Sequence, residues 1–179
     1  TGSPHLELIE PGYKYNMTDV QAAVGIHQIK RLESFLETHR QYSAAYRAAL
    51  QEVEEISLPV DSDAPNTRHA WLWFIIQLRL EKLSVTRDEF VEALKKENVG
   101  TGIHYRSLHL HHYYRKTHGY KPQDFPNAAW ISERVVSLPF YPKMDEKDLA
   151  GVVCAVKKLV RYYSKFTRVQ VPQVEIGVN

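Results

Sequence analysis

The chain has 179 residues, 44% of them apolar and 25% charged, and carries a formal net charge of +2. This composition is ordinary for a globular protein, and the small net charge argues against the strong basic surface that nucleic-acid-binding proteins need. The single cysteine, Cys154, excludes an internal disulfide and fits a reducing compartment. No apolar run is long enough to span a bilayer and no signal peptide is visible, so we expect a cytoplasmic protein without membrane or nucleic-acid partners.

One long or kinked helix, or two helices in tandem, is predicted over residues 19–52. Thr18 and Gln21 have the spacing of a capping box at its start. Apolar residues then recur at helical spacing along the segment. They lie nearly all round its first half, so we expect that half to be deeply buried.

The entry to this helix, residues 12–16 with the sequence GYKYN, is polar and aromatic. A helix N-terminus offers free backbone N–H groups and the positive end of the helix dipole, and together these attract anions. Lys14 and Asn16 stand just before the cap and are suited to bind a phosphate there. The alternative is a plain turn that carries a surface lysine and an asparagine.

The rest of the chain predicts an alternation of strands and helices. In chain order these are strands at 56–60 and 70–80, a helix at 86–98, a strand at 101–106, a helix at about 125–136, an extended stop at 137–142, a helix capped by Asp145, and a tail at 168–179 that is an edge strand or a mobile end. This order predicts an α+β fold with a small, mostly antiparallel sheet backed by helices. The sequence contains no glycine-rich phosphate loop.

Three residues in these elements are predicted to be buried. Trp71 and Trp73 stand two apart on the strand at 70–80, so we expect them on one face of the sheet and in the core. Cys154 lies in the last helix, where we expect a small buried apolar residue.

Five histidines occur within residues 104–118, together with tyrosines and arginines. A metal site is disfavoured because no cysteine lies nearby and the spacing matches no zinc pattern. Histidine, tyrosine and arginine together also suit a phosphorylated or sugar ligand. A polar loop with partly packed rings is the simpler alternative.

Four blocks of sequence, taken in order, resemble one known family. They are GYKYNMTDVQAAVGIHQIKRL, RHAW, VGTGIHYRSLHLHHYYR and SLPFYPKMDEKDL. Over about residues 7–162 the chain resembles the C-terminal part of the DegT/DnrJ/StrS family of sugar aminotransferases. It looks closest to the branch that aminates UDP-4-keto sugars, such as the UDP-4-amino-4-deoxy-arabinose aminotransferase.

The resemblance implies an aspartate aminotransferase-like fold of type I, of which this chain would be the C-terminal small domain. Family members are homodimers that bind pyridoxal 5′-phosphate through a Schiff-base lysine in a large domain. They transfer an amino group, here expected from glutamate, to a nucleotide-linked keto-sugar for cell-wall or polysaccharide biosynthesis. The domains would be residues 1–18, leading from the large domain, the small domain at 19–163 and the tail at 164–179.

The resemblance also implies roles for individual residues. Lys14 and Asn16 would contact the pyridoxal phosphate of the neighbouring subunit, although many relatives have asparagine and arginine at these two positions. The residues implied to bind substrate are Tyr13, His104, Tyr105 and His109. The chain starts after the place of the Schiff-base lysine, so no catalytic residue is expected in it, and alone it should be inactive. The alternative is a non-catalytic binding or dimerisation module of the same fold.

Overall fold

The computed structural model describes residues 12–60 and 66–166, and this part divides into two compact units between Phe35 and Leu36. The first unit holds the polar entry and the first helix. The second holds the sheet and the remaining helices. The domain boundaries expected at residues 18 and 163 stay predictions.

Two helices in tandem occupy the segment expected to be helical, so the second form of that prediction is confirmed. Helix α1 spans Asp19–Ile29 and helix α2 spans Leu32–Leu50. The Thr18 hydroxyl accepts a hydrogen bond from the backbone N–H of Gln21, whose side chain accepts one from the backbone N–H of Thr18. This reciprocal capping box satisfies donors that a helix N-terminus otherwise leaves free.

The expected burial of α1 is wrong for this chain, because no residue of the helix is buried. The side chains of Val20, Val24, Ile26 and Ile29 are 57–76% exposed. Apolar residues on every side of a helix predict a buried environment, but they do not say which polypeptide provides it. No described residue of the first unit covers them.

The second unit is built on a three-stranded antiparallel sheet in the order β1-β2-β3. Strand β1 spans Ile56–Ser57, β2 spans Phe74–Leu78 and β3 spans Val135–Leu138. Ile56 pairs with Leu78, and Phe74 pairs with Leu138. With its helices, this sheet confirms the α+β class and the small antiparallel sheet expected from the sequence.

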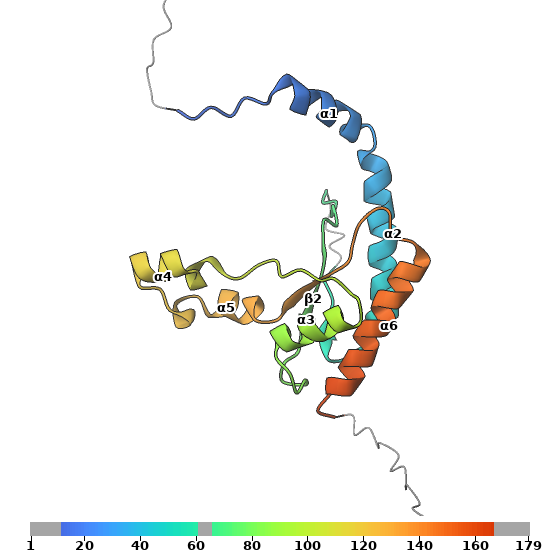
Figure 1. The fold of residues 1–179 in the computed structure, drawn as a ribbon, viewed down its shortest axis with the longest axis vertical. Helices are drawn as coiled ribbons and strands as arrows, with labels where there is room; N and C mark the ends of the chain where they lie inside the picture. Colours follow the sequence, from blue (N-terminus) through green and yellow to red (C-terminus); the bar gives the residue numbers. More distant parts are fainter. Residues whose placement is uncertain (1–11, 61–65, 167–179) are drawn as a thin grey trace, which may run out of the picture. The chain divides into compact units, whose positions relative to one another are not determined.

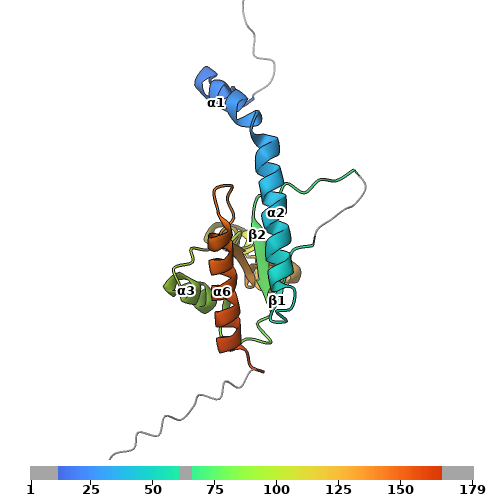
Figure 2. The ribbon, with the colours of Figure 1, turned by 90° about the vertical axis from the view of Figure 1, so that its right-hand side faces the viewer.

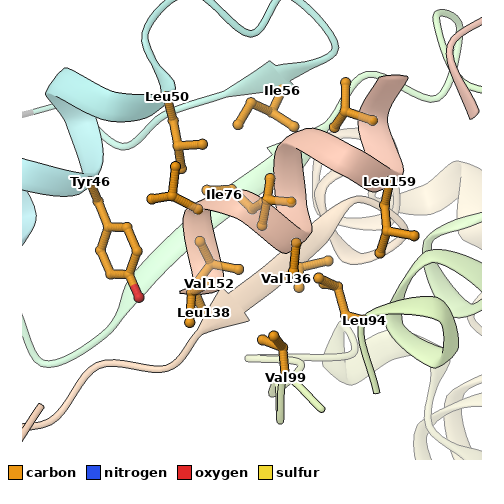
Figure 3. Close-up of a cluster of buried hydrophobic side chains, with 14 of the residues drawn as sticks. Tyr46, Leu50, Ile56, Ile76, Leu94, Val99, Val136, Leu138, Val152 and Leu159 are labelled. Carbon is orange, nitrogen blue, oxygen red and sulfur yellow. The ribbon is translucent and has the colours of Figure 1, made fainter. Parts of the chain in front are cut away.

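Helices α2 and α6 (Glu146–Tyr163) lie on the same side of the sheet, and α3 (Arg87–Lys96) packs beside α6 (Figures 1 and 2). Figure 3 shows the core that they enclose, with Leu50 of α2, Leu94 of α3, Leu159 of α6 and Val136 of β3 converging on one cluster. Burying a side chain of this size stabilises the fold by about 1.5–3 kcal/mol. The core therefore holds the second unit together.

The helix expected at about 125–136 is too long. Helix α5 spans Pro126–Ser132, the chain turns at Glu133–Arg134, and β3 follows. The predicted helix includes Val135 and Val136, yet these two residues pair with β2. Short apolar runs fit either period, and the β-branched pair favours the strand.

The strand expected at 101–106 is reduced to one isolated bridge between Gly102 and Ser137. The histidine-rich connection that follows contains short helices: the 3₁₀ turns η1 (Leu108–Leu110) and η2 (Pro122–Asp124), and between them α4 (His112–His118). This connection and α5 lie on the side of the sheet away from α6 (Figure 1).

Two expectations about single residues are also wrong. Strand β2 starts only at Phe74, since Trp71 has a φ of 47° that breaks the extended backbone; Trp71 is buried, whereas Trp73 is 38% exposed. Cys154 is exposed on α6, because the buried stripe of that helix runs through its neighbours Val153 and Ala155. The tail at 168–179 lies outside the described residues. Among the helices that are described, none is long and apolar enough to cross a membrane.

Candidate functional site

The clearest candidate site in the second unit is a cluster formed by Trp73, Gly102, His104, Tyr105 and Ser137, here called the His104 group. The His104 ring stacks on the Trp73 ring, with centroids 4.3 Å apart and planes inclined by 4°. Tyr105 meets both rings edge-on, 4.8 Å from His104 and 5.7 Å from Trp73. Three rings so arranged hold one another in a defined orientation.

Strand β3 anchors this group through Ser137. The backbone N–H of Gly102 donates to the Ser137 carbonyl at 3.0 Å, and the Ser137 N–H donates to the Gly102 carbonyl at 2.8 Å. The buried Ser137 hydroxyl lies 2.7 Å from Nδ1 of His104. The sheet therefore positions the histidine both through the backbone and through a side chain.

Gly102 is required by the position of the His104 ring. A Cβ atom added at Gly102 would lie 2.6 Å from Cε1 of His104 and 3.2 Å from its Nδ1. Atoms that close repel strongly, so any side chain at residue 102 displaces the ring. The imidazole occupies the volume that a side chain at residue 102 would fill.

The outer members of the His104 group face solvent. Tyr105 is 63% exposed, Trp73 is 38% exposed and His104 is half-buried. An exposed aromatic surface backed by a fixed imidazole can bind a ligand through ring stacking and hydrogen bonds. His104 and Tyr105, which are adjacent in sequence and predicted to bind substrate, both belong to this partly exposed aromatic group.

The other predicted site residues lie elsewhere. Tyr13, Lys14 and Asn16 belong to the first unit and are exposed, and Tyr13 contacts Tyr15 with ring centroids 5.8 Å apart. His109 is buried against Phe125, with centroids 5.0 Å apart.

His109 has an unusual environment for a histidine. Its Nε2 atom is buried and has no hydrogen-bond partner in the described part of the chain. It lines a hollow of about 350 Å³ together with Tyr114, Tyr120 and Phe125. Buried polar atoms usually have partners, so this nitrogen has the capacity to bind one more polar group.

Sequence reasoning missed Trp73, Gly102 and Ser137 as parts of the site. The sequence predicts Trp73 in the core and Gly102 in a strand at 101–106, with no site role for either residue. Ser137 is 33 residues from His104, and no local pattern joins two such positions. For Ser137, the one available signal is a polar residue inside a strand whose neighbours Val136 and Leu138 are apolar.

A metal centre has no support in residues 12–60 and 66–166, where no three histidine, cysteine, aspartate or glutamate side chains come together in a way that could hold an ion. The histidines at 104–118 instead enter separate ring contacts. His104 stacks on Trp73, His109 packs on Phe125, and His118 stacks on Tyr120.

Comparison with known proteins decides the family. The model of the DegT/DnrJ/EryC1/StrS aminotransferase family matches residues 3–157. The chain belongs to this family. The matched range includes both the polar entry to α1 and the whole His104 group.

Relatives of known sequence extend the match to nearly the whole chain. An uncharacterized protein of Methanocaldococcus jannaschii is 45% identical over 159 residues, and the spore coat polysaccharide biosynthesis protein SpsC of Bacillus subtilis is 42% identical over 161 residues. Each alignment covers 89% of this chain and 41% of the relative. The chain thus spans about two fifths of the length of these relatives.

Solved structures of aminotransferases share the fold. The PLP form of a protein of Streptococcus pneumoniae, named as a sugar aminotransferase, matches with a TM-score of 0.79 at 23% identity, over 90% of this chain and 40% of that one. The aminotransferase PseC of Helicobacter pylori, involved in the biosynthesis of pseudoaminic acid, matches with a TM-score of 0.77 at 14% identity, over 88% and 41%. These likenesses confirm that the chain has the fold of part of an aminotransferase.

Proposed function

We propose that this chain is the C-terminal part of a pyridoxal-phosphate-dependent aminotransferase that aminates a nucleotide-linked keto-sugar, with glutamate as the amino donor. The observation that carries the proposal is the family match over residues 3–157, which includes the exposed His104 group. The cofactor, when bound, supplies the electron sink for amino transfer. The chain alone would be inactive, since none of its lysines lies in the family's Schiff-base context. The enzyme would act as a homodimer.

The first unit fits the phosphate end of the cofactor. Lys14 offers an ammonium group and Asn16 an amide, and both are exposed just before the capped N-terminus of α1. These are donors of the kind that bind phosphate, and the helix dipole favours the same charge. In this proposal Lys14 and Asn16 hold the phosphate of the neighbouring subunit's cofactor, while Tyr13 and His109 contact substrate.

His104 would act as a hydrogen-bond donor toward the substrate. The hydroxyl of Ser137 is buried, and Nδ1 of His104 is its one partner among the described residues. A buried hydroxyl hydrogen without an acceptor costs about 1–3 kcal/mol, so Ser137 donates to Nδ1. With Nδ1 as the acceptor, the imidazole N–H that could donate to an oxygen of the sugar is the one at Nε2.

The decisive experiment uses a polypeptide of full family length that carries these residues. Amino transfer from glutamate to a panel of nucleotide-linked keto-sugars is measured for wild type, His104→Ala and His104→Gln. Loss of one hydrogen bond to substrate predicts a fall in kcat/KM of roughly 10-fold or more for His104→Ala. His104→Gln keeps an N–H donor and should recover part of that loss. Unchanged kcat/KM in His104→Ala removes this residue from the site.

The cofactor role of the first unit has its own test in the same polypeptide. Lys14→Ala should weaken pyridoxal phosphate binding, measured by absorbance titration, while the melting temperature of the apo form stays unchanged. Lys30→Ala removes an equal charge from the C-terminal end of α1 and serves as the control. If stability falls while cofactor affinity holds, the phosphate role of Lys14 is wrong.

A non-catalytic binding or dimerisation module is the second candidate, and the exposed apolar side chains of α1 favour it. Such side chains suit contact with another polypeptide. Sedimentation of the 179-residue chain tests the dimer, and an amino-transfer assay of a protein of full family length distinguishes the module from the enzyme. A stable dimer of the chain that Val24→Lys dissociates, together with no amino transfer by the full-length protein, supports the module.

A further inference from the structure

We infer that a hollow on the histidine-rich connection binds a diphosphate group. This hollow, here called the basic hollow, has a volume of about 650 Å³. It is lined by Arg106, His112, Arg115, Lys116, Tyr120 and Lys121, and also by the single carboxylate of Glu133. It is distinct from the His104 group, with which it shares no lining residue.

Local structure explains why these side chains meet. His112, Arg115 and Lys116 stand at positions i, i+3 and i+4 of α4, so they project from one face of that helix. Gly119 ends the helix with a left-handed φ of 69°, which turns the chain so that Lys121 reaches the same hollow. Arg106 enters from the extended segment directly after Tyr105.

The positive charge of the basic hollow is not balanced. Arg106, Arg115, Lys116 and Lys121 are exposed, and no ion pair joins any of them to a carboxylate in the part of the chain that the structure describes. The Glu133 carboxylate lies 3.8 Å from Arg134 instead. Four cations around one concave surface repel one another and concentrate anions there.

The side chains favour phosphoryl groups over a simple carboxylate. The arginine fork donates two parallel hydrogen bonds to phosphate oxygens, and lysine adds a point charge. Four permanent cations exceed what one phosphate needs, and the volume lies within the range of small-ligand pockets, so a diphosphate matches the hollow best. The source is either free pyrophosphate or the diphosphate of a nucleotide-linked sugar. The second source rests on the proposed function, and Arg106 lies next in sequence to Tyr105 of the His104 group.

The test titrates the 179-residue chain with inorganic pyrophosphate and, separately, with UDP-glucose at low ionic strength. Arg115→Ala/Lys116→Ala should weaken binding of either probe at least 10-fold. Lys95→Ala/Lys157→Ala removes the same charge from exposed positions of α3 and α6 and should change binding less than 2-fold. Circular dichroism checks that both variants keep the fold. Backbone amide shifts should move at Arg106 and Lys121 on addition of pyrophosphate.

The outcomes test both the diphosphate site and the source of the diphosphate. Absence of pyrophosphate binding, or equal losses in the two double variants, overturns the diphosphate site. UDP-glucose that binds through the same residues and also shifts Trp73 or Tyr105 supports the substrate as the source. Pyrophosphate that binds there while UDP-glucose does not supports the site and overturns the nucleotide-sugar source. Failure of amino transfer in the full-length polypeptide overturns the proposed function and leaves the diphosphate site standing.

Discussion

Helices α1 and α6 begin with the same capping motif but differ in burial. Each starts with a complete capping box, Thr18 with Gln21 in α1 and Asp145 with Asp148 in α6. Helix α6 buries six residues in the core of its unit, whereas α1 buries none. Capping and apolar spacing therefore establish that a segment is helical. Only the packing within a unit establishes whether its apolar side chains are buried in a core.

The same contrast separates the two groups of predicted site residues. Tyr13 and Tyr15 contact each other, and both are 86% exposed. The rings of Trp73 and His104 are fixed by a strand, a glycine and a buried hydroxyl. The second group is preorganised by this chain, whereas the described residues of the first unit give Tyr13 and Tyr15 no comparable support.

The largest expected effect separates the cores of the two units. Leu94→Ala empties a fully buried position of α3 and should lower the free energy of unfolding by about 3 kcal/mol. Leu32→Ala makes the same change in the first unit, where Leu32 is 45% exposed, and should stay within about 0.5 kcal/mol. Urea denaturation of both variants gives the comparison. Similar losses would show that the first unit has a core of its own.

A smaller effect on stability is expected when a side chain is added at Gly102, against the His104 ring. Gly102→Ala places a methyl group against the imidazole and should cost about 1–3 kcal/mol, because the ring or the strand must move. Gly100→Ala meets nothing within 4 Å and is the control. NMR shifts of the His104 ring and of the Trp73 ring report the displacement. If Gly102→Ala leaves both signals in place, the close packing described here is wrong.

Much of the fold could be predicted because its signals are local. The helix predicted at 86–98 and the helix predicted to be capped by Asp145 correspond to α3 and α6, and Asp145 does cap α6. The errors occur where a short segment fits two periods. Val135 and Val136 continue the apolar pattern of α5, but only pairing with β2, which is distant in sequence, makes them a strand.

The candidate site could be predicted only in part, for a related physical reason. His104 and Tyr105 are adjacent in sequence and stand in a recognisable block. Their supports are not local: Trp73 precedes β2, and Ser137 belongs to β3. Such contacts depend on how the strands pair, and the local sequence around His104 does not indicate this pairing.

A modest effect is expected at the capping boxes. Thr86→Ala removes the cap of α3, a helix whose Phe90 and Leu94 lie in the core, and should destabilise the second unit by about 1 kcal/mol. Thr18→Ala makes the same change at α1, which no core depends on, so the melting temperature of the second unit should not move. Differential scanning calorimetry measures both. Equal shifts would mean that α1 contributes to the stability of the second unit.

The smallest expected effect is a difference in pH dependence between the same two caps. Hydrogen bonds from the backbone and side chain of Thr86 hold the pKa of Glu89 below its ordinary value of 4.5, because they stabilise the ionised carboxylate. Since the pKa is lowered in the folded state, this stabilisation is present above pH 4.5 and is lost as the pH falls through the folded pKa. Glu89→Gln keeps an acceptor but does not titrate, so its melting temperature should fall less than that of wild type between about pH 5 and 3. A wild-type curve that parallels Glu89→Gln over this range would mean that the Thr86–Glu89 box does not form in solution.

In α1 the corresponding position of the capping box holds Gln21. Gln21→Glu should therefore introduce an acid-sensitive cap at the start of α1. The helicity of α1, followed by amide NMR shifts, should then fall as the pH is lowered.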